Sequence, residues 1–462
     1  MIINLYLIFK FIIYEKRYVF ALAASSLLFS ACSSDDAVVS TVGQNEAVQQ
    51  IVLQVASSGD GLTTRAGRPL YSSEALQTIQ NVRVVIYDAT TNAIVKDKQL
   101  NWKDSKTYTN HGRQLTLTYK GDERLGEGNY KVMAVGYSDN SDYTYALDVT
   151  STEALTGTYK DITATLKAGK VAEEVFAGDA ELNINADKKI TNLTKGEDDG
   201  VAVTLHRQVA GSFGYFQNIP ASVNGKAAAT LRLVVRDKND VLTFNNFNSS
   251  FTANGATGST IKYYVNGSKS TSAATADAKF NNNEDGYVLY SIDLSKWFTE
   301  GDKNKDGLLN AEDTWTHPTS VKTQVVKGSV FGSNFVIPFN LTSGKSTMEL
   351  QLLDAENNII KTWTVSIPTA DVNTDATNGN VADVSPSIFN VVRNHMYNLG
   401  VKTSTGTTTP PDPSNPDPDP NKPDPDKPKP GTDEPEDLTK SQNLILKVND
   451  NWEAIHQMEL GD

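Results

Sequence analysis

The chain has 462 residues, of which 39% are hydrophobic and 21% are charged, so it can bury a hydrophobic core and form two or three domains. Its formal net charge of −13 argues against a nucleic-acid-binding protein, which needs a basic face to replace the counterions of phosphates. The single cysteine, Cys32, excludes an intramolecular disulfide, a thiolate zinc site and an iron–sulfur cluster.

The common catalytic signatures are missing from the sequence. The five histidines are scattered, with no pair at metal-ligand spacing. The sequence has no G-x-S-x-G, H-E-x-x-H, P-loop or G-x-G-x-x-G motif. We therefore expect that the protein is not an enzyme.

Residues 1–31 have the pattern of a lipoprotein signal peptide. A positive pair, Lys16-Arg17, precedes an apolar stretch over residues 18–29 that is too short to span a bilayer. Small residues stand directly before Cys32, which resembles a bacterial lipobox, in which the cysteine receives acyl chains such as palmitate. The alternative is an ordinary secretory signal followed by an incidental cysteine.

The four residues after the cysteine, Ser33-Ser34-Asp35-Asp36, are short and acidic. They resemble the tag that sends Bacteroidetes lipoproteins to the outer face of the outer membrane. The alternative is a polar tether without an address. We expect a precursor held by its lipid at the cell outer membrane surface.

Residues 32–65 are expected to form a leader that is removed on maturation. The leader contains one strand-like run, Ile51–Val55, followed by a segment rich in Ser, Gly and Thr that ends at Arg65. An exposed arginine between a lone strand and the first domain is a natural cleavage point for a trypsin-like, Arg-specific protease, which would cut between Arg65 and Ala66. The alternative is an ordinary exposed arginine.

Residues 66–402 alternate apolar and polar side chains with period two, which predicts half-buried strands and an all-β fold, most simply β-sandwiches. The clearest runs begin at Val82, Tyr130, Leu231 and Met348. We expect an N-terminal sandwich over 66–216 and a C-terminal sandwich over 217–402. A D-A-x-x-N-x-I turn after one strand in each half, 88–94 and 354–360, is a weak sign that the halves are related.

Residues 302–313 predict a calcium loop in the C-terminal sandwich. Oxygen-bearing side chains at positions 1, 3, 5, 9 and 12 surround a glycine at position 6, and Ca²⁺ takes six to eight oxygen ligands. The loop looks dockerin-like, but it is single and lies among strands, so we expect a structural ion and no dockerin role. The alternative is a polar turn. The expected ligands are Asp302, Asn304, Asp306, the carbonyl of Leu308, Asn310 and Asp313.

Residues 403–437 predict an extended spacer. Eleven of the 17 prolines lie between Pro410 and Pro435 among Asp and Lys, and these 26 residues would extend over roughly 80 Å as polyproline II. The final segment, 438–462, contains the strand-like run Leu444–Val448. A strand beyond a long spacer cannot bury its apolar face locally, so we expect it to need a sheet that belongs to another molecule.

The leader run and the C-terminal run share one pattern, in which three apolar residues are followed by a polar and an apolar residue. Alternate residues of a strand share a face, so each run presents an apolar triplet. We therefore hypothesise that the leader strand fills a groove that a neighbour's C-terminal strand later occupies, although two amphipathic strands can look alike by chance. The two triplets are Ile51, Leu53 and Val55, and Leu444, Leu446 and Val448.

Together these segments resemble the fimbrillins, the pilins of Bacteroidales type V pili, and are most similar to shaft subunits of the minor-fimbrium type. The resemblance includes Cys32 and Thr64-Arg65-Ala66. Further segments follow in order: 128–132 (GNYKV), 174–178 (EVFAG), 205–210 (LHRQVA), 218–220 (NIP), 393–397 (RNHMY) and the W-x4-Q-x-E of Trp452, Gln457 and Glu459.

The resemblance implies two transthyretin-like β-sandwiches and a C-terminal donor strand. It implies a surface lipoprotein that an arginine-specific protease cleaves at Arg65, and a groove that accepts a neighbour's strand. The partners would be identical pilin subunits and the other fimbrial subunits, anchor and tip, in a pilus that supports cell adhesion. Such head-to-tail contacts do not close, so they make filaments.

Two other functions remain open at this point. A glycan-binding surface lipoprotein of a polysaccharide-uptake system would also be β-rich, but it predicts exposed tryptophan platforms. A pilus anchor would keep its leader and lipid, and a tip subunit would lack the C-terminal extension. The presence of both Arg65 and the extension favours a shaft subunit.

Overall fold

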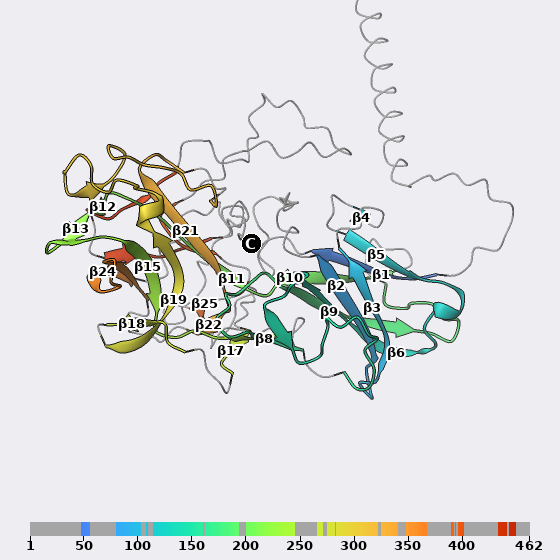
Figure 1. Cartoon of the computed structure of the whole chain (residues 1–462). Coiled ribbons are helices and arrows are strands. Elements are labelled where there is room, and N and C mark those ends of the chain that lie inside the picture. The colour runs from blue at the N-terminus through green and yellow to red at the C-terminus, as the bar shows by residue number, and fades with distance from the viewer. Residues whose placement is uncertain are drawn as a thin grey trace, which may run out of the picture. The chain divides into compact units, whose positions relative to one another are not determined.

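The computed structural model divides the chain into residues 1–47 and 48–462, and all the described residues belong to the second unit. It describes residues 48–55, 80–102, 108–109, 114–159, 162–193, 200–244, 266–270, 275–281, 283–321, 325–340, 348–366, 390–391, 393, 396–401, 433–440 and 443–449. Figure 1 shows that these residues form strands joined by loops.

The first half of the chain forms an eight-stranded sheet in the order β3-β2-β6-β9-β10-β1-β5-β4. The pairing of β9 with β10 covers two residues of each strand, so the sheet turns a corner there. The strands are β1 (Gln49–Val55), β2 (Asn81–Asp88), β3 (Ile94–Asn101), β4 (Tyr108–Thr109), β5 (Gln114–Tyr119), β6 (Gly128–Tyr137), β9 (Phe176–Ile184) and β10 (Gly200–Arg207).

One hydrophobic core lies between the two sides of this sheet. Inward-facing side chains of β2, β6 and β9 pack against those of β10, β1 and β5, and Leu53, Val84, Val132 and Val203 have no exposed surface. Burying such side chains is the main favourable term in folding. The two sides of the sheet therefore pack as a sandwich.

The second half of the chain forms a six-stranded and a five-stranded sheet. The six-stranded sheet has the order β18-β19-β15-β23-β24-β28, and the five-stranded sheet has the order β21-β11-β26-β29, with β27 paired to β11. Their strands are β11 (Ala210–Gln217), β15 (Thr230–Val235), β18 (Ala278–Phe280), β19 (Glu284–Asp293), β21 (Ser329–Val336), β23 (Met348–Leu353), β24 (Ile359–Ser366), β26 (Met396–Leu399), β27 (Glu436–Asp437), β28 (Asn443–Ile445) and β29 (Lys447–Asn449).

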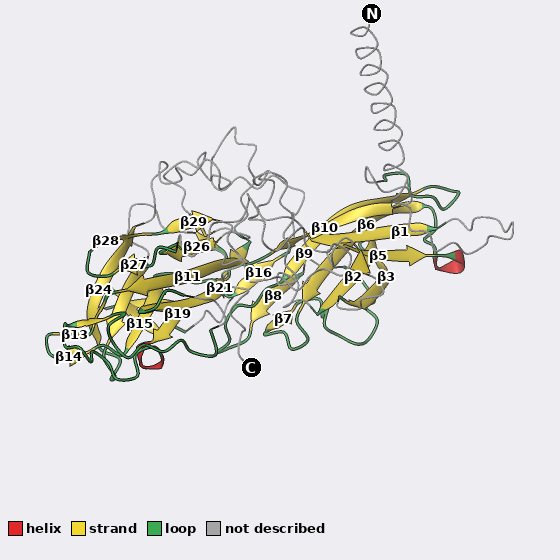
Figure 2. Cartoon of the chain, turned by 90° about the horizontal axis from the view of Figure 1, so that it is seen from above, coloured by secondary structure: helices red, strands yellow, loops and turns green. Residues whose placement is uncertain are grey.

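Smaller elements complete the described structure (Figure 2). Four strands form the sheet β17-β16-β8-β7: β7 (Tyr143–Tyr145), β8 (Thr163–Leu166), β16 (Val241–Thr243) and β17 (Gly267–Ser268). Two-stranded ladders join β12 (Ile219–Pro220) to β20 (Leu308–Leu309), β13 (Ser222–Val223) to β14 (Lys226–Ala227), and β22 (Phe339–Asn340) to β25 (Asn390–Val391). The described helices are η2 (Gly121–Glu123) and η3 (Leu294–Lys296). Neither has the length and hydropathy that a membrane crossing requires.

The structure confirms the all-β sandwich fold expected from period two, but the central strands are more deeply buried than expected. In β2 and β23, polar residues that alternation places opposite the apolar ones are also buried, among them Arg83 and Gln351. The guanidinium of Arg83 donates to Asp97 and to the carbonyls of Ser151 and Glu153. Strand β3 supplies Asp97 and a loop supplies the two carbonyls, so both faces of β2 are buried.

The change of sheet falls earlier in the chain than the expected boundary between 216 and 217. Strand β10 belongs to the first sheet, whereas β11 pairs along its whole length with β21 of the second half. Gln208 and Val209 therefore connect the two halves. The apparent break in pattern at Gly211–Pro220 consists of most of β11 and all of β12, and Gly211 and Gly214 pair normally within β11.

The repeated motif forms a hairpin turn in both halves, between β2 and β3 and between β23 and β24, and the second turn is one residue shorter. Each turn has an asparagine with positive φ, Asn92 and Asn357, and each strand pair has a bulge beside it. The third strand of each group differs in chain order, because β6 follows β2 while β15 precedes β23. The repeat is therefore local and does not extend to the strand order around it.

Candidate strand-exchange site

The leader strand β1 lies inside the first sheet, between β10 and β5 (Figure 2). It runs parallel to β10, with Ile51 beside Val201 and Leu53 beside Val203. It runs antiparallel to β5, where Leu53 faces Leu115. Both edges of β1 are paired, so the strand joins β10 to β5 across the sheet.

The side chains of β1 complete the first core. Ile51 and Leu53 are 1% and 0% exposed and belong to the cluster that also holds Leu117 and Val203. Val52, which alternation places on the opposite face, is 1% exposed. Fully burying one such side chain stabilises by roughly 1.5–3 kcal/mol, so removal of β1 would expose a long apolar groove.

A buried glutamine fixes the N-terminal end of β1, and the sequence analysis did not identify it. The side chain of Gln49 is 1% exposed and makes three hydrogen bonds. Its Nε2 donates to the carbonyls of Leu125 and Lys188, each at 3.0 Å, and its Oε1 accepts from the amide of Leu125 at 2.8 Å. The period-two pattern could have shown that Gln49 shares a face with Ile51.

The C-terminal run packs on its own chain, contrary to the expectation that it needs another molecule. Strand β28 runs parallel to β24, and β29 runs antiparallel to β26, so the chain passes from one sheet to the other at Leu446. Leu444 and Leu446 are both fully buried in the second core. The two strands are only three residues long each.

Residues 433–440 also pack on the second half. Strand β27 pairs with β11, Leu438 is 1% exposed, and Asn218 donates to Asp437 at 2.9 Å. Burial alone raises the pKa of Asp437, but hydrogen bonds from Thr439, Asn218 and Lys440 outweigh it and lower the pKa to about 2. This carboxylate is therefore ionised at neutral pH and holds the segment in place.

The chain on the two sides of the Pro/Asp-rich stretch meets through backbone hydrogen bonds, and the role of the stretch as a spacer stays a prediction. The amide of Val401 donates to the carbonyl of Glu434 at 2.8 Å, and the amide of Glu434 donates back to Val401 at 2.9 Å. The residues that join them, 402–432, lie outside the described structure. Val401 and Glu434 therefore lie side by side, and residues 433–437 are part of the fold.

Three segments that carry the fimbrillin resemblance meet where the chain passes between the halves. Arg207 donates to Glu174 at 2.5 Å, and both side chains are at most 1% exposed. Gln208 donates to the carbonyls of Ala177 and His206 and accepts from Arg393. The buried ion pair and the hydrogen bonds of Gln208 together join these three segments at the crossover.

The predicted calcium loop is compact and anchored at β20 to β12. Asp313 accepts the amides of Lys303 and Asn310, and Asp302 Oδ2 accepts the amide of Gly307 at 2.9 Å. Gly307 has a φ of +87°, which favours glycine. Asp302 Oδ1 is shielded from solvent and accepts no hydrogen bond.

The side chains of the loop are mainly bonded to one another. Asp306 accepts the amide of Leu308 at 2.8 Å and the side-chain amides of Asn304 and Asn310. These bonds, led by that from Leu308, lower the pKa of Asp306. The described residues contain no group of three or more His, Cys, Asp or Glu arranged to hold a metal ion. An ion would have to replace some of the bonds within the loop.

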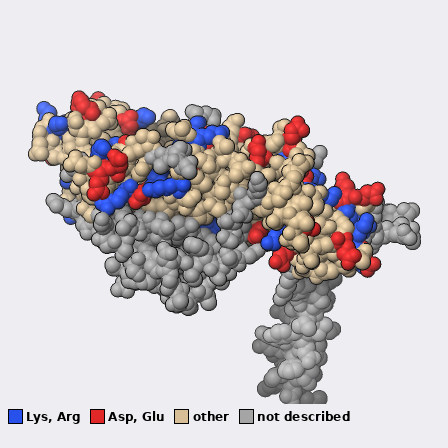
Figure 3. All heavy atoms as spheres, turned by 90° about the horizontal axis from the view of Figure 1, so that it is seen from below, with Lys and Arg blue, Asp and Glu red and all other residues tan. Residues whose placement is uncertain are grey.

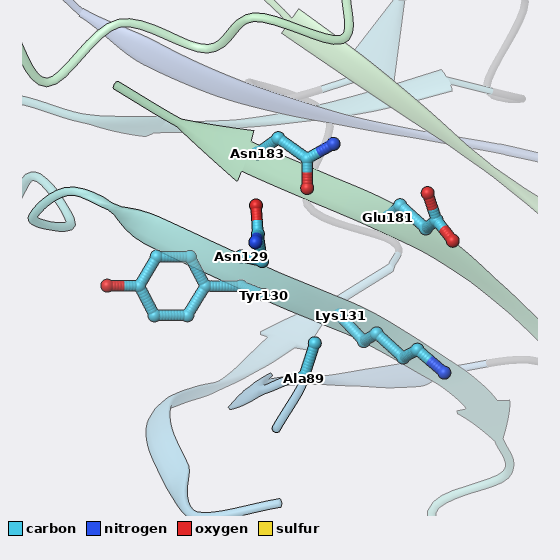
Figure 4. Close-up of a pocket in the computed structure, with 6 residues that line it drawn as sticks. All are labelled: Ala89, Asn129, Tyr130, Lys131, Glu181 and Asn183. Carbon is cyan, nitrogen blue, oxygen red and sulfur yellow. The ribbon is translucent and has the colours of Figure 1, made fainter. Parts of the chain in front are cut away.

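A polar hollow of about 300 Å³ lies on the β6–β9 pair (Figure 4). Asn129 faces Asn183 and Lys131 faces Glu181 across the strands, and Ala89 of the β2–β3 turn borders them. These amide, amine and carboxylate groups can hydrogen-bond water or a small polar ligand.

Several expected site residues lie outside the described structure. These are Cys32, Arg65 and Ala66. The backbones of Val55 and Val448 are described, but their side chains are not. The lipidation and cleavage sites therefore remain predictions from sequence.

No family model matches the sequence, and no curated protein matches it. The structure is similar to that of a fimbrial assembly protein from Parabacteroides distasonis, at 14% identity and a TM-score of 0.32, over 77% of this chain and 92% of that one. It is also similar to a putative adhesin from Bacteroides ovatus (12%, 0.36, over 69% and 78%) and to a fimbrial anchor protein from Porphyromonas gingivalis (11%, 0.34, over 76% and 90%).

Proposed function

We propose that the protein is a structural subunit of a cell-surface pilus, exported as a lipoprotein and polymerised by strand exchange after cleavage at Arg65. The observation that carries the proposal is the position of β1. A strand from the expected leader lies between β10 and β5 and contributes Ile51 and Leu53 to the core. Its loss would open the sheet that it completes.

An open sheet of this kind favours association with another chain. Losing β1 leaves the facing backbone groups of β10 and β5 unpaired and uncovers apolar side chains, and both changes are costly. A strand from a second subunit repairs both by β-augmentation. The C-terminal run has the matching apolar pattern, and its attachments in its own chain are two three-residue strands, whereas β1 is paired over seven residues.

The alternative of glycan binding through aromatic platforms has less support. Among the described tryptophans, Trp102, Trp297 and Trp363 are at most 3% exposed. Trp315 is half-buried, and its Nε1 donates to the carbonyl of Ser329. Stacking on a sugar needs an exposed indole face, so these side chains favour a structural role. Acidic and basic residues are interspersed on the face shown in Figure 3.

Cleavage of the purified chain tests the proposal directly. The chain without its signal peptide should remain monomeric until a trypsin-like protease cuts after Arg65, and should then form filaments visible by electron microscopy. Excess synthetic peptide covering residues 48–55 should suppress assembly, because it refills the groove. A cleaved chain that loses its leader and stays monomeric at high concentration would contradict the proposal.

The hydrogen bonds between Val401 and Glu434 lead to a prediction about subunit spacing. Because Val401 and Glu434 are bonded and β27 pairs with β11, residues 402–432 need not span between subunits. Deletion of residues 412–428 should therefore leave filament formation and the axial repeat unchanged. A repeat that shortens in electron micrographs of the deletion variant would show that the stretch is a spacer after all. An insertion of equal length is the matched control.

We also propose that the 302–313 loop binds a structural Ca²⁺, with the shielded Asp302 Oδ1 as one ligand. Ion binding to the folded loop alone stabilises by about 2.7 kcal/mol at one hundred times Kd. EDTA should then lower the Tm by roughly 5 °C or more. Asp306→Ala should abolish the response, and Glu312→Ala, outside the ligand set, should keep it. A melting curve unchanged by EDTA would exclude the ion.

A further inference from the structure

The C-terminal run and β1 match at one further position, two residues before the first apolar residue of each. When Leu444 is aligned with Ile51, the residue two positions before each is a glutamine, Gln442 and Gln49. The segments then read Q-Q-I-V-L-Q-V and Q-N-L-I-L-K-V. Residues two apart share a face of a strand, so in an exchanged strand Gln442 would lie on the side of the apolar triplet, as Gln49 does in β1.

The environment of Gln49 is a socket that recognises a primary amide. It offers two carbonyls, of Leu125 and Lys188, and one amide N–H, of Leu125. Only a side chain with two N–H donors and an acceptor at one end satisfies all three groups. Glutamate supplies acceptors alone, and asparagine is shorter by one methylene group.

Local structure preforms the socket. Leu125 follows η2 and is 5% exposed within the first core, and Lys188 lies in a turn with a φ of +58° in which its amide donates to Asn185. An empty socket leaves three backbone groups without their partner, the two of Leu125 in a buried site and the carbonyl of Lys188 in a part-buried one. A buried backbone group without a partner keeps its full desolvation penalty, so the socket disfavours any strand that does not fill it.

We infer that Gln442 of one subunit occupies the Gln49 socket of the next, and that this amide fixes the register of strand exchange. This inference rests on the proposed strand exchange. The apolar triplet alone tolerates a slip of two residues, because such a slip returns apolar side chains to the inner face. A slip of two residues toward either end carries Gln442 out of the socket. The glutamine therefore acts as a register key for a second copy of this chain.

Paired cysteines test the register, and cleavage at Arg65 would leave a chain with no cysteine of its own, since Cys32 is the only one. Gln50 faces Thr118 of β5. The aligned residue is Asn443, so subunits with Asn443→Cys and Thr118→Cys should form intermolecular disulfides on assembly. Asn443→Cys with Thr116→Cys, displaced by two residues, should give little product, because diagonal Cβ atoms are about 7–8 Å apart.

Gln442→Ala is the decisive variant. It should slow in-register crosslinking roughly tenfold and raise the proportion of the displaced product, and Gln442→Glu should behave alike. Ser441→Ala, one residue away, is the matched control and should change neither. Unchanged products with Gln442→Ala would overturn the inference while leaving strand exchange intact. If subunits that keep Gln442 form neither intermolecular disulfide, the strand exchange itself is overturned.

Discussion

Leu446→Asp is expected to abolish filament formation after cleavage. In the neighbour's groove this residue would take the place of Leu53, which has no exposed surface and lies among Leu115, Leu117 and Val203. An aspartate there would lose the apolar burial and place an unpaired charge in the core, which costs several kcal/mol. Size-exclusion chromatography and electron microscopy of the cleaved variant measure the loss.

The structure adds a requirement to this experiment, because Leu446 is also buried in its own chain. The variant should have a lower Tm, so a folding defect must be separated from a failure to donate. A cleaved Leu446→Asp subunit keeps its own groove and should still accept a wild-type strand. Mixed with wild-type subunits, it should cap filaments and shorten them in proportion to its fraction.

Two outcomes would contradict this account. Filaments of normal length from Leu446→Asp alone would show that the C-terminal run is not the donor. If the filament length in mixtures does not depend on the fraction of the variant, the variant cannot accept a strand. Asn443→Asp is the matched control, since it introduces a carboxylate at the position aligned with the outward-facing, half-exposed Gln50. It should polymerise normally.

Arg65→Ala is expected to keep the leader attached and to prevent polymerisation. The uncut leader holds β1 beside β10 and β5 by a continuous chain, so a donor strand from another molecule competes with an intramolecular one at high effective concentration. The variant should remain in the membrane fraction through Cys32. N-terminal sequencing of sheared surface material gives the measurement, with Ala66 as the expected first residue of the wild type.

The nearby Arg68 provides the control for this prediction. Arg68→Ala should be cleaved and assembled as the wild type, and the double variant should behave as Arg65→Ala does. Normal filaments from the double variant would show that assembly does not require cleavage in this segment. If Arg65→Ala forms filaments and the double variant does not, the protease cleaves at Arg68.

Local pattern predicted the strands themselves. The runs beginning at Ile51, Val82, Tyr130, Leu231 and Met348 all lie within described strands, since period two reflects only the pleat of a single strand. The same rule predicted that Leu444 and Leu446 are buried together, and both are. The D-A-x-x-N-x-I motif predicted the turns, in which Asp88 and Asp354 accept the amides of Thr90 and Glu356, two residues ahead.

Only the tertiary structure decided which strands meet and which polar groups are buried. The pattern of β1 does not reveal that its neighbours are β10 and β5, some 150 and 65 residues away along the chain. Nor does it reveal that a loop would cover Arg83, that Gln49 would meet Leu125 and Lys188, or that residues 433–440 and 443–449 would pack on the second half. Period two specifies the two faces of a strand, whereas its neighbours and partners depend on contacts between residues distant in sequence, which no local window contains.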